Sequence, residues 1–231
     1  MSKICFKIII IGDLNVGKTS MINRYVYNTF SERYKATIGV DLFKKDLKYK
    51  NNRVSLQLWD TAGVERFQAV TPSFYRGSDA CVLVFDLTNN KSFESLEQWI
   101  DEFLIYANPQ DPDSFPFIIL GNKSDLLDPN DVNNIIINRS RIERFCKMKN
   151  IKYFSVSAKN NENIFSAFSY LINKLMKSDT DAKNNELESN NFIEYTPTNY
   201  YTEDLTENYD KKISTNNVQY VYPDLTNSCY C

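Results

Sequence analysis

Short apolar runs alternate with amphipathic segments along most of this chain. Continuous apolar runs are typical of strands that are covered on both faces. Four such strands are predicted at residues 3–11, 80–87, 115–120 and 151–156. Two more segments, 40–50 and 53–60, predict a hairpin around the turn-favouring pair Asn51-Asn52. The pattern therefore predicts six strands in all.

Between the strands lie segments whose apolar residues recur at helical spacing. The first, 18–28, turns Met21, Ile22, Tyr25 and Val26 to its inner face. The later ones are marked by Phe93, Leu96, Ile100, Phe103 and Leu104, by Ile142, Phe145 and Met148, and by Ile164, Phe165, Phe168, Leu171, Ile172 and Leu175. This alternation predicts an α/β fold with a mostly parallel sheet and helices on both faces. Ligands of such sheets bind beyond the carboxyl ends of the strands.

The composition of the chain changes at about Ser178. Residues 178–231 carry ten acidic residues and three lysines, a net charge of −7, and few aliphatic side chains. The residues before them keep 24 basic and 19 acidic residues, a net charge of +5. A segment as polar as the tail cannot bury enough apolar surface to fold alone. We therefore expect one folded domain, 1–177, followed by a disordered acidic tail, 178–231.

The histidine and cysteine content of the chain limits the kinds of catalytic and metal site that it can form. The chain has no histidine, which excludes imidazole catalysis and histidine metal sites, so any metal is expected to be held by oxygen. Five cysteines give no disulfide framework, and Cys5, Cys81 and Cys146 lie in apolar stretches typical of reduced thiols. The first residues lack the layout of a signal peptide, and no apolar run approaches the roughly 18 residues of a membrane-spanning helix. A cytosolic protein is expected.

Residues 12–20, Gly-Asp-Leu-Asn-Val-Gly-Lys-Thr-Ser, match the pattern G-x-x-x-x-G-K-[ST] between a predicted strand and a predicted helix. Gly12 and Gly17 let the backbone turn so that several N–H groups and a helix N-terminus face one anion. Lys18 brings a positive charge near the β- and γ-phosphates, and the Thr19 hydroxyl can bind Mg²⁺. A nucleotide is therefore expected to contact Asp13, Leu14, Asn15, Val16, Gly17, Lys18, Thr19 and Ser20.

Two further motifs follow predicted strands. One is expected to contribute to the phosphate site and the other to form a site for the base. In Asp60-Thr-Ala-Gly63, the aspartate can hold Mg²⁺ through water while the Gly63 N–H meets a γ-phosphate. In Asn122-Lys123-Ser-Asp125, the Asp125 carboxylate can accept hydrogen bonds from N1–H and the 2-amino group of guanine. Adenine does not present that pair of donors. The stems of Asn122 and Lys123 are expected to pack against the base.

A third motif, Ser157-Ala158-Lys159, follows the last predicted strand, and the Ala158 N–H can meet guanine O6. Taken in order, the four motifs resemble the Ras-type small GTPase superfamily, whose small G domain is a P-loop NTPase fold. The resemblance covers residues 3–177. Within the superfamily the chain is most similar to the Rab branch, at residues 38–41, 56–63, 65–67, 74–77 and 83–88. Two stretches, 34–39 and 101–117, resemble the late-endosomal and lysosomal Rab subgroup. The resemblance implies a GTP/GDP switch that uses Mg²⁺, hydrolyses GTP and regulates vesicle traffic.

Further site residues are implied by the resemblance alone. Thr37 joins Thr19 and Asp60 on Mg²⁺ and senses the γ-phosphate. Phe30 packs beside guanine, and Tyr34 lies over the phosphates. The expected catalytic contacts are made by Lys18, Thr37 and Gly63, and effectors are expected to read an aromatic surface that includes Trp59 and Phe74.

The chain departs from the family pattern at three positions. Leu42 stands where the family usually has phenylalanine, and Phe43, one residue later in a strand, points to the opposite face. The expected effector surface is therefore Leu42, Trp59 and Phe74. Val64 occupies the place of the glutamine that orients the attacking water, so slow intrinsic hydrolysis is expected. Leu14 crowds the γ-phosphate.

The chain ends Ser228-Cys229-Tyr-Cys231, which resembles the Cys-x-Cys end on which Rab proteins carry two geranylgeranyl groups. Two lipid chains give stable anchoring where one does not. The resemblance implies the cytosolic face of endosomal and lysosomal or vacuolar membranes, with a cytosolic pool. It also implies an exchange factor, a GTPase-activating protein, a GDP-dissociation inhibitor and a prenylation escort protein as partners. No nucleic-acid partner is expected.

Two alternatives stay open at this point. Another P-loop nucleotide enzyme, such as a kinase, is disfavoured by Asn122, Asp125 and the Cys-x-Cys end. A GTP-loaded scaffold that never cycles is favoured by Val64 and Leu14. A comparison of GTP and ATP affinities distinguishes the first alternative from a GTP/GDP switch. GTP turnover in the presence of an activating protein distinguishes the second.

Overall fold

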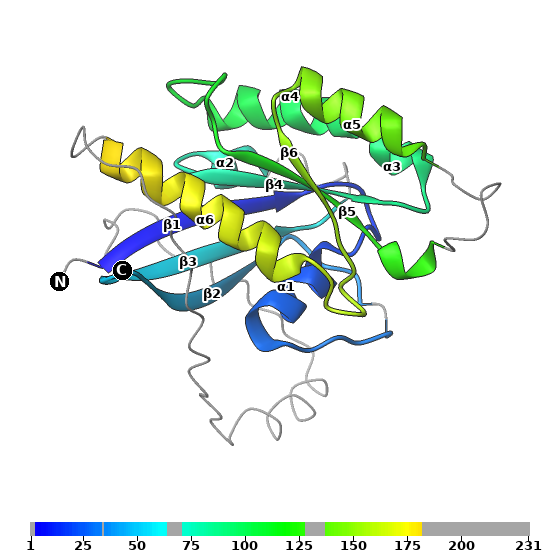
Figure 1. Cartoon of the computed structure of the whole chain (residues 1–231), viewed down its shortest axis with the longest axis horizontal. Helices are drawn as coiled ribbons and strands as arrows, with labels where there is room; N and C mark the ends of the chain where they lie inside the picture. Colours follow the sequence, from blue (N-terminus) through cyan, green and yellow to red (C-terminus); the bar gives the residue numbers. More distant parts are fainter. Residues whose placement is uncertain (1–2, 34, 64–70, 128–136, 182–231) are drawn as a thin grey trace, which may run out of the picture.

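The computed structural model describes residues 3–33, 35–63, 71–127 and 137–181. The described strands form one six-stranded sheet in the order β2-β3-β1-β4-β5-β6 (Figure 1). β2 pairs antiparallel with β3, and the other neighbouring strands pair in parallel. This sheet confirms the predicted α/β fold. The strands are β1 (Lys3–Ile11), β2 (Val40–Tyr49), β3 (Asn52–Thr61), β4 (Ala80–Asp86), β5 (Phe117–Asn122) and β6 (Lys152–Ser155).

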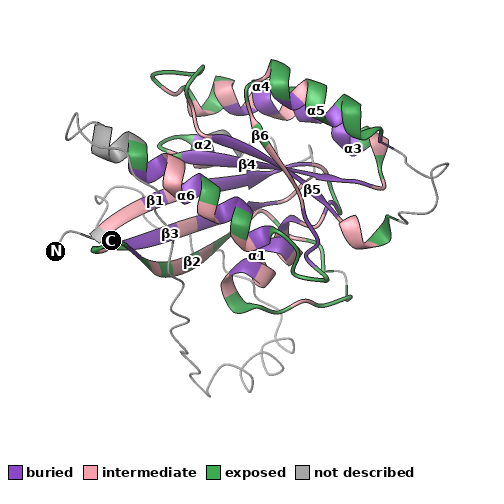
Figure 2. Ribbon diagram, in the orientation of Figure 1, coloured by how far each residue is buried: buried purple, intermediate pink, exposed green. Residues whose placement is uncertain are grey.

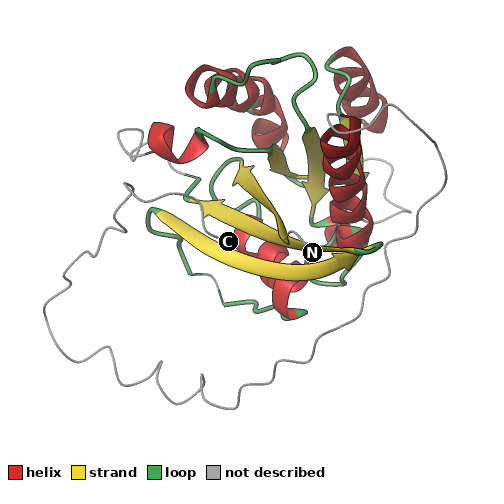
Figure 3. Ribbon diagram, turned by 90° about the vertical axis from the view of Figure 1, so that its left-hand side faces the viewer, coloured by secondary structure: helices red, strands yellow, loops and turns green. Residues whose placement is uncertain are grey.

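Helices cover both faces of the sheet, as Figure 3 shows in side view. One face packs against α1 (Lys18–Tyr27) and α6 (Ile164–Asp181). The other face packs against α2 (Thr71–Tyr75), α3 (Asn90–Glu94), α4 (Leu96–Ala107) and α5 (Arg139–Met148). A short 3₁₀ turn, η2 (Ser124–Leu126), follows β5.

The central strands contain continuous apolar runs, 8–11, 80–85 and 117–120, because both of their faces are covered. In β1, Ile8 and Ile10 pack on the side of α1 and α6, while Ile9 and Ile11 pack on the side of α2 to α5. Every residue of β4 and β5 is likewise buried (Figure 2). This explains why these strands are continuous apolar runs in the sequence.

The predicted hairpin is confirmed, but its turn lies one residue earlier than expected. Tyr49 pairs with Asn52, so the connection is Lys50 and Asn51 rather than Asn51 and Asn52. Lys50 takes the left-handed conformation, with φ of 51°. The register was decided by the ten paired positions of β2 and β3, which outweigh the local preference of two asparagines.

Three other local expectations were wrong in detail. The helical pattern at 93–104 is divided at Ser95 into α3 and α4. β5 begins at Phe117, while Phe115 packs against the core from the preceding loop. In α5, Cys146 is buried and Met148 is 70% exposed, because residues two apart in an α-helix point to opposite sides.

The cysteines in the described part behave as expected. Cys81 and Cys146 are buried, Cys5 is half-buried, and none of these three forms a disulfide. Burial raises the pKa of both buried thiols, that of Cys146 to about 11, which keeps them protonated and unreactive. Among the described helices, we find none with the length and apolar character needed to cross a bilayer.

Candidate functional site

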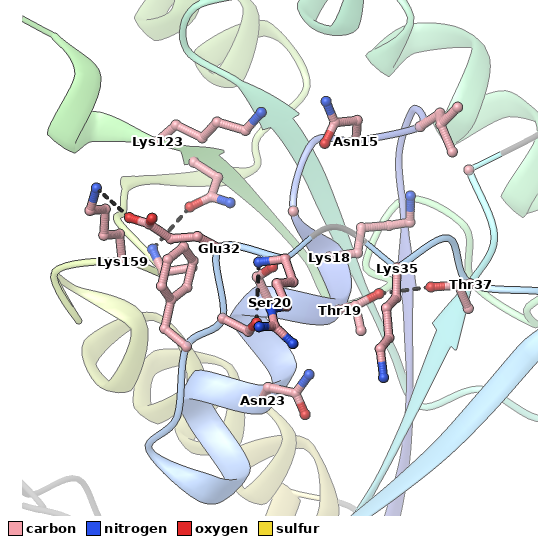
Figure 4. Close-up of a pocket in the computed structure, with 18 of the residues that line it drawn as sticks. Asn15, Lys18, Thr19, Ser20, Asn23, Glu32, Lys35, Thr37, Lys123 and Lys159 are labelled. Atoms are coloured by element: carbon pink, nitrogen blue, oxygen red, sulfur yellow. Dashed lines mark hydrogen bonds and ion pairs between the residues drawn. The ribbon is translucent and has the colours of Figure 1, made fainter. Parts of the chain in front are cut away.

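A cavity of about 720 Å³ lies beyond the carboxyl ends of β1, β3, β5 and β6 (Figure 4). This is the edge at which an open parallel sheet binds its ligands. Most of the residues expected from the sequence line the cavity: Leu14, Asn15, Gly17, Lys18, Thr19, Ser20, Phe30, Thr37, Gly63, Asn122, Lys123, Asp125, Ala158 and Lys159.

The phosphate loop between β1 and α1 depends on glycine at both of its ends. At Gly12, φ is 143° and an added Cβ would lie 2.1 Å from the Val84 carbonyl oxygen. At Gly17, φ is 93° and a Cβ would lie 2.4 Å from Nδ2 of Asn122. Any larger residue would push the loop away from β4 and from the base-side loop. The tight turn is what brings the start of α1 to the cavity.

Lys18 reaches across this loop from the first turn of α1. Its Nζ donates to the carbonyl oxygens of Gly12 at 2.7 Å and Asp13 at 2.8 Å, and the residue is 5% exposed. Burial lowers its pKa to about 8, although the charges of Asp60 and Asp13 work in the opposite direction. A bound polyphosphate would supply the missing counter-charge and hold the ammonium in its charged form.

Three oxygen-bearing side chains converge beside Lys18. Thr19 Oγ1 donates to Asp60 Oδ2 at 2.5 Å and lies 2.8 Å from Thr37 Oγ1 (Figure 4). Asp60 is fully buried, and its second oxygen, Oδ1, has no hydrogen-bond partner in the described structure. A buried carboxylate oxygen without a partner, next to two hydroxyls, fits a hard divalent cation such as Mg²⁺. Burial raises the Asp60 pKa to about 6, against the opposing effects of the Thr19 hydroxyl and Lys18.

The base side of the cavity is formed by the loops after β5 and β6. Asn122 is 2% exposed and joins these loops to the phosphate loop: its Nδ2 donates to the Val16 carbonyl at 2.9 Å, and its Oδ1 accepts from the Ala158 N–H at 3.1 Å. The Ala158 N–H that we expected to face guanine O6 therefore already has a partner. Asn122 acts here as a brace between walls of the cavity.

Asp125 lines the cavity, and one of its carboxylate oxygens is held by a hydrogen bond. The Ser157 hydroxyl donates to Asp125 Oδ1 at 2.5 Å, and Ser157 itself is fully buried. Lys123 forms an ion pair with Asp86 at 2.7 Å, which holds its ammonium at the carboxyl end of β4. Lys159 pairs with Glu32 at 3.0 Å across the mouth of the cavity (Figure 4).

Four expected residues do not line the cavity with their side chains. Val16, Ser157 and Asp60 are buried behind its wall. The Asp13 carboxylate is turned away: it accepts hydrogen bonds from the Ser95 hydroxyl at 2.9 Å and from Trp99 Nε1 at 2.7 Å. These bonds join the phosphate loop to α4. The expected contact of Asp13 with the nucleotide stays a prediction. Tyr34, Val64, Cys229 and Cys231 lie outside the described residues.

Several lining residues were missed by sequence reasoning. Most belong to the polar segment after α1, which brings both charges and hydroxyls to the cavity. The segment has no periodic pattern and no motif, so polarity next to a phosphate loop was the one available signal. The missed residues are Asn23, Thr29, Ser31, Glu32, Arg33, Lys35, Thr61 and Leu126.

A separate surface lies on β2, β3 and α2. Leu42 is 56% exposed and pairs in register with Trp59, whose ring centre lies 5.6 Å from that of Phe74. Phe43 points the other way and packs against the core cluster that contains α1. The predicted opposite orientation of Leu42 and Phe43 is confirmed.

Comparisons with known proteins agree with this geometry. The model of the Ras family matches residues 7–177. The Ypt/Rab-type GTPase Rab7 of Neurospora crassa is 48% identical over 181 residues, which cover 78% of this chain and 86% of the relative. Rab-7a of Dictyostelium discoideum is 48% identical, and the Ras-related protein Rab7 of Cenchrus ciliaris is 46% identical, each over 176 residues that cover 76% of this chain and 84% of the relative. This chain belongs to the Ras family of small GTPases, in the Rab7 subgroup of its Rab branch.

Proposed function

We propose that this small GTPase is a Rab-type switch that regulates traffic at late endosomal or vacuolar membranes and binds GTP and GDP together with Mg²⁺. The observation that carries the proposal is the convergence of four separate motifs on one cavity in a chain of the Rab7 subgroup. Membership of the Ras family also speaks against another kind of P-loop nucleotide enzyme.

In this proposal the residues around the phosphates act mainly by placing charge. Lys18, buried and short of counter-charge, stabilises the negative charge that builds up on the transferred phosphate. The Gly63 N–H and the Thr37 loop contact the same group. Bound Mg²⁺ supplies further positive charge, and Thr19, Thr37 and Asp60 hold it.

The switch follows from contacts that only a triphosphate completes. Thr37 and Gly63 lie on two loops that converge on the phosphate site, so loss of the γ-phosphate removes a shared anchor. Moving a two-state loop equilibrium from 1:99 to 99:1 needs about 5.5 kcal/mol of differential binding. Several charge-assisted contacts of the kind proposed here reach that sum.

Binding of Mg²⁺ is expected to weaken below pH 6. The raised pKa of Asp60, about 6, means that protons compete with the cation for this carboxylate in mildly acidic solution. The apparent Mg²⁺ dissociation constant of the GDP-bound protein is expected to rise about tenfold per pH unit below that pKa, and to stay constant well above it. Fluorescent GDP, titrated with Mg²⁺ between pH 5 and 8, reports it.

Asp41→Asn is the matched control for this pH dependence. Asp41 pairs with Asp60 across β2 and β3, and its charge contributes to raising the Asp60 pKa. Removing that charge is expected to shift the onset of weak binding to lower pH. If the Mg²⁺ affinity of the wild type does not change between pH 8 and pH 5, the role given to Asp60 is wrong.

In this proposal the acidic residues 178–231 connect the folded domain to the membrane. α6 continues to Asp181 and includes the first four residues of the expected tail. At about 5–6 Å × √n, the 50 residues 182–231 would give a disordered tether a root-mean-square reach of ~40 Å. Geranylgeranyl groups on Cys229 and Cys231 would anchor the protein to the cytosolic face, with a cytosolic pool kept by a GDP-dissociation inhibitor. An exchange factor, a GTPase-activating protein and a prenylation escort protein serve the same cycle, and effectors bind Leu42, Trp59 and Phe74.

Removal of both terminal cysteines is expected to release the protein from membranes. The tagged full-length chain should label late endosomal or vacuolar membranes, whereas the double variant Cys229→Ser, Cys231→Ser should be diffuse in the cytosol, because two prenyl chains give the stable anchoring. Fluorescence microscopy and membrane fractionation measure this. Ser228→Ala, which keeps both cysteines, should behave as wild type; membrane labelling that survives loss of both thiols would refute the lipid anchor.

A further inference from the structure

Arg24 lies in the second half of α1, outside the motifs of the nucleotide site. Its guanidinium makes four hydrogen bonds, all to uncharged oxygens. Nε donates to the Ala158 carbonyl at 2.9 Å, and Nη2 donates to the Lys159 carbonyl at 3.0 Å. Two adjacent peptide carbonyls of the loop after β6 are thus bound by one planar group.

The same guanidinium also binds the chain that leaves α1. Nη1 donates to the backbone carbonyl of Asn28 at 2.8 Å and to its side-chain oxygen at 3.2 Å. Asn28 ends the helix in the left-handed conformation, with φ of 56°, and lies two residues before Phe30, which lines the cavity. Arg24 therefore joins the segment that carries Phe30 to the loop that carries Ala158.

The opposite side of the loop after β6 faces the base site. The Ser157 hydroxyl donates to Asp125, and the Ala158 N–H donates to Asn122. The loop is thus held by the two side chains of the base motif on its inner side and by Arg24 on its outer side. A shift of this loop would move the hydroxyl that orients the Asp125 carboxylate.

We propose that Arg24 is a positioning residue for guanine recognition, which acts through the loop after β6 and through the chain before Phe30. This inference rests on the proposed base site at Asp125. It goes beyond that site because Arg24 does not line the cavity and belongs to none of the recognition motifs.

The planar shape of the side chain is essential to this role. Three nitrogens of one guanidinium reach three carbonyl oxygens from two segments, an arrangement that a single ammonium cannot reproduce. Lysine keeps the positive charge but lacks the planar set of N–H donors. Arg24→Lys therefore separates positioning from electrostatics, and Arg24→Ala removes both.

The test compares GDP with inosine diphosphate on the full-length chain. Inosine diphosphate lacks the 2-amino group that Asp125 is proposed to bind and keeps the rest of the base and the phosphates. Both Arg24 variants are expected to raise the GDP dissociation constant about 10- to 100-fold, the effect of losing hydrogen bonds from a charged donor. The constant for inosine diphosphate should rise much less, so the preference for GDP shrinks.

Arg141 offers matched controls. It bonds to Asn90 at 2.9 Å and to Glu94 at 3.2 Å, between α5 and α3, and does not line the cavity. Arg141→Lys and Arg141→Ala should leave both affinities unchanged. Circular dichroism and thermal unfolding of the GDP-loaded variants verify that they are folded.

Three results would overturn the inference. Equal losses for both nucleotides would make Arg24 merely structural, and wild-type behaviour of Arg24→Lys would reduce its role to charge. If the wild type does not distinguish GDP from inosine diphosphate, the Asp125 site fails and the inference fails with it. The first two results leave the proposed function intact, so the two failures are distinguishable.

Discussion

Asp125→Asn is expected to weaken GTP binding by about 10²- to 10⁴-fold and to create affinity for xanthosine triphosphate. In the proposed site the carboxylate accepts two hydrogen bonds from guanine, each worth about 1.5–3 kcal/mol as a charged interaction. The Ser157 hydroxyl donates to Oδ1 of Asp125, so the amide oxygen of asparagine takes that place. Its NH₂ group then faces the base, where it repels the 2-amino group of guanine and suits the 2-carbonyl of xanthine.

Affinities for GTP, xanthosine triphosphate and ATP, measured by competition against a fluorescent nucleotide, test this expectation. Asp125→Ala is the control, because it removes the acceptor without adding a donor and should bind both nucleotides weakly. If the asparagine variant keeps wild-type affinity for GTP, Asp125 does not read the base.

Val64→Gln is expected to raise intrinsic GTP hydrolysis by about 10²–10³-fold, the usual effect of one polar group placed near a transition state. Unassisted hydrolysis in proteins of this kind is already near 10⁻⁴ s⁻¹ even when that glutamine is present. Val64 lies outside the described residues, but its neighbour Gly63 packs directly on the phosphate loop. A Cβ at Gly63 would lie 2.5 Å from the Leu14 nitrogen, so Gly63 itself lies directly against the phosphate loop.

Single-turnover hydrolysis of bound GTP, without an activating protein, measures the effect. Val64→Leu is the matched control, since it changes the shape of the side chain but adds no hydrogen-bonding group, and it should keep the slow rate. Equal rates for the glutamine variant and the wild type would remove Val64 from the account of slow hydrolysis. The same assay on Leu14→Ser then shows whether crowding by Leu14 limits the rate.

Much of the molecule could be read from local patterns. The apolar runs at Ile8–Ile11 and in β4 predicted buried parallel strands, because only strands covered on both faces are apolar throughout. The side-chain alternation of a strand predicted that Leu42 and Phe43 face opposite ways. Glycines in the phosphate loop predicted a tight turn, and the close contacts of Gly12 and Gly17 bear this out.

The sequence by itself determined the order of strands and helices and the four loops that meet at the cavity, since each of these is encoded within a few neighbouring residues. Only the tertiary structure decided how the walls of that cavity are braced. Arg24 and Ala158 are 134 residues apart, and Asp13 and Trp99 are 86 residues apart. An arginine on a helix or an aspartate in a loop has many possible partners, and which one it meets depends on how the sheet brings distant loops together. For this reason the sequence pattern did not reveal the hydrogen bonds of Arg24 or those of the Asp13 carboxylate.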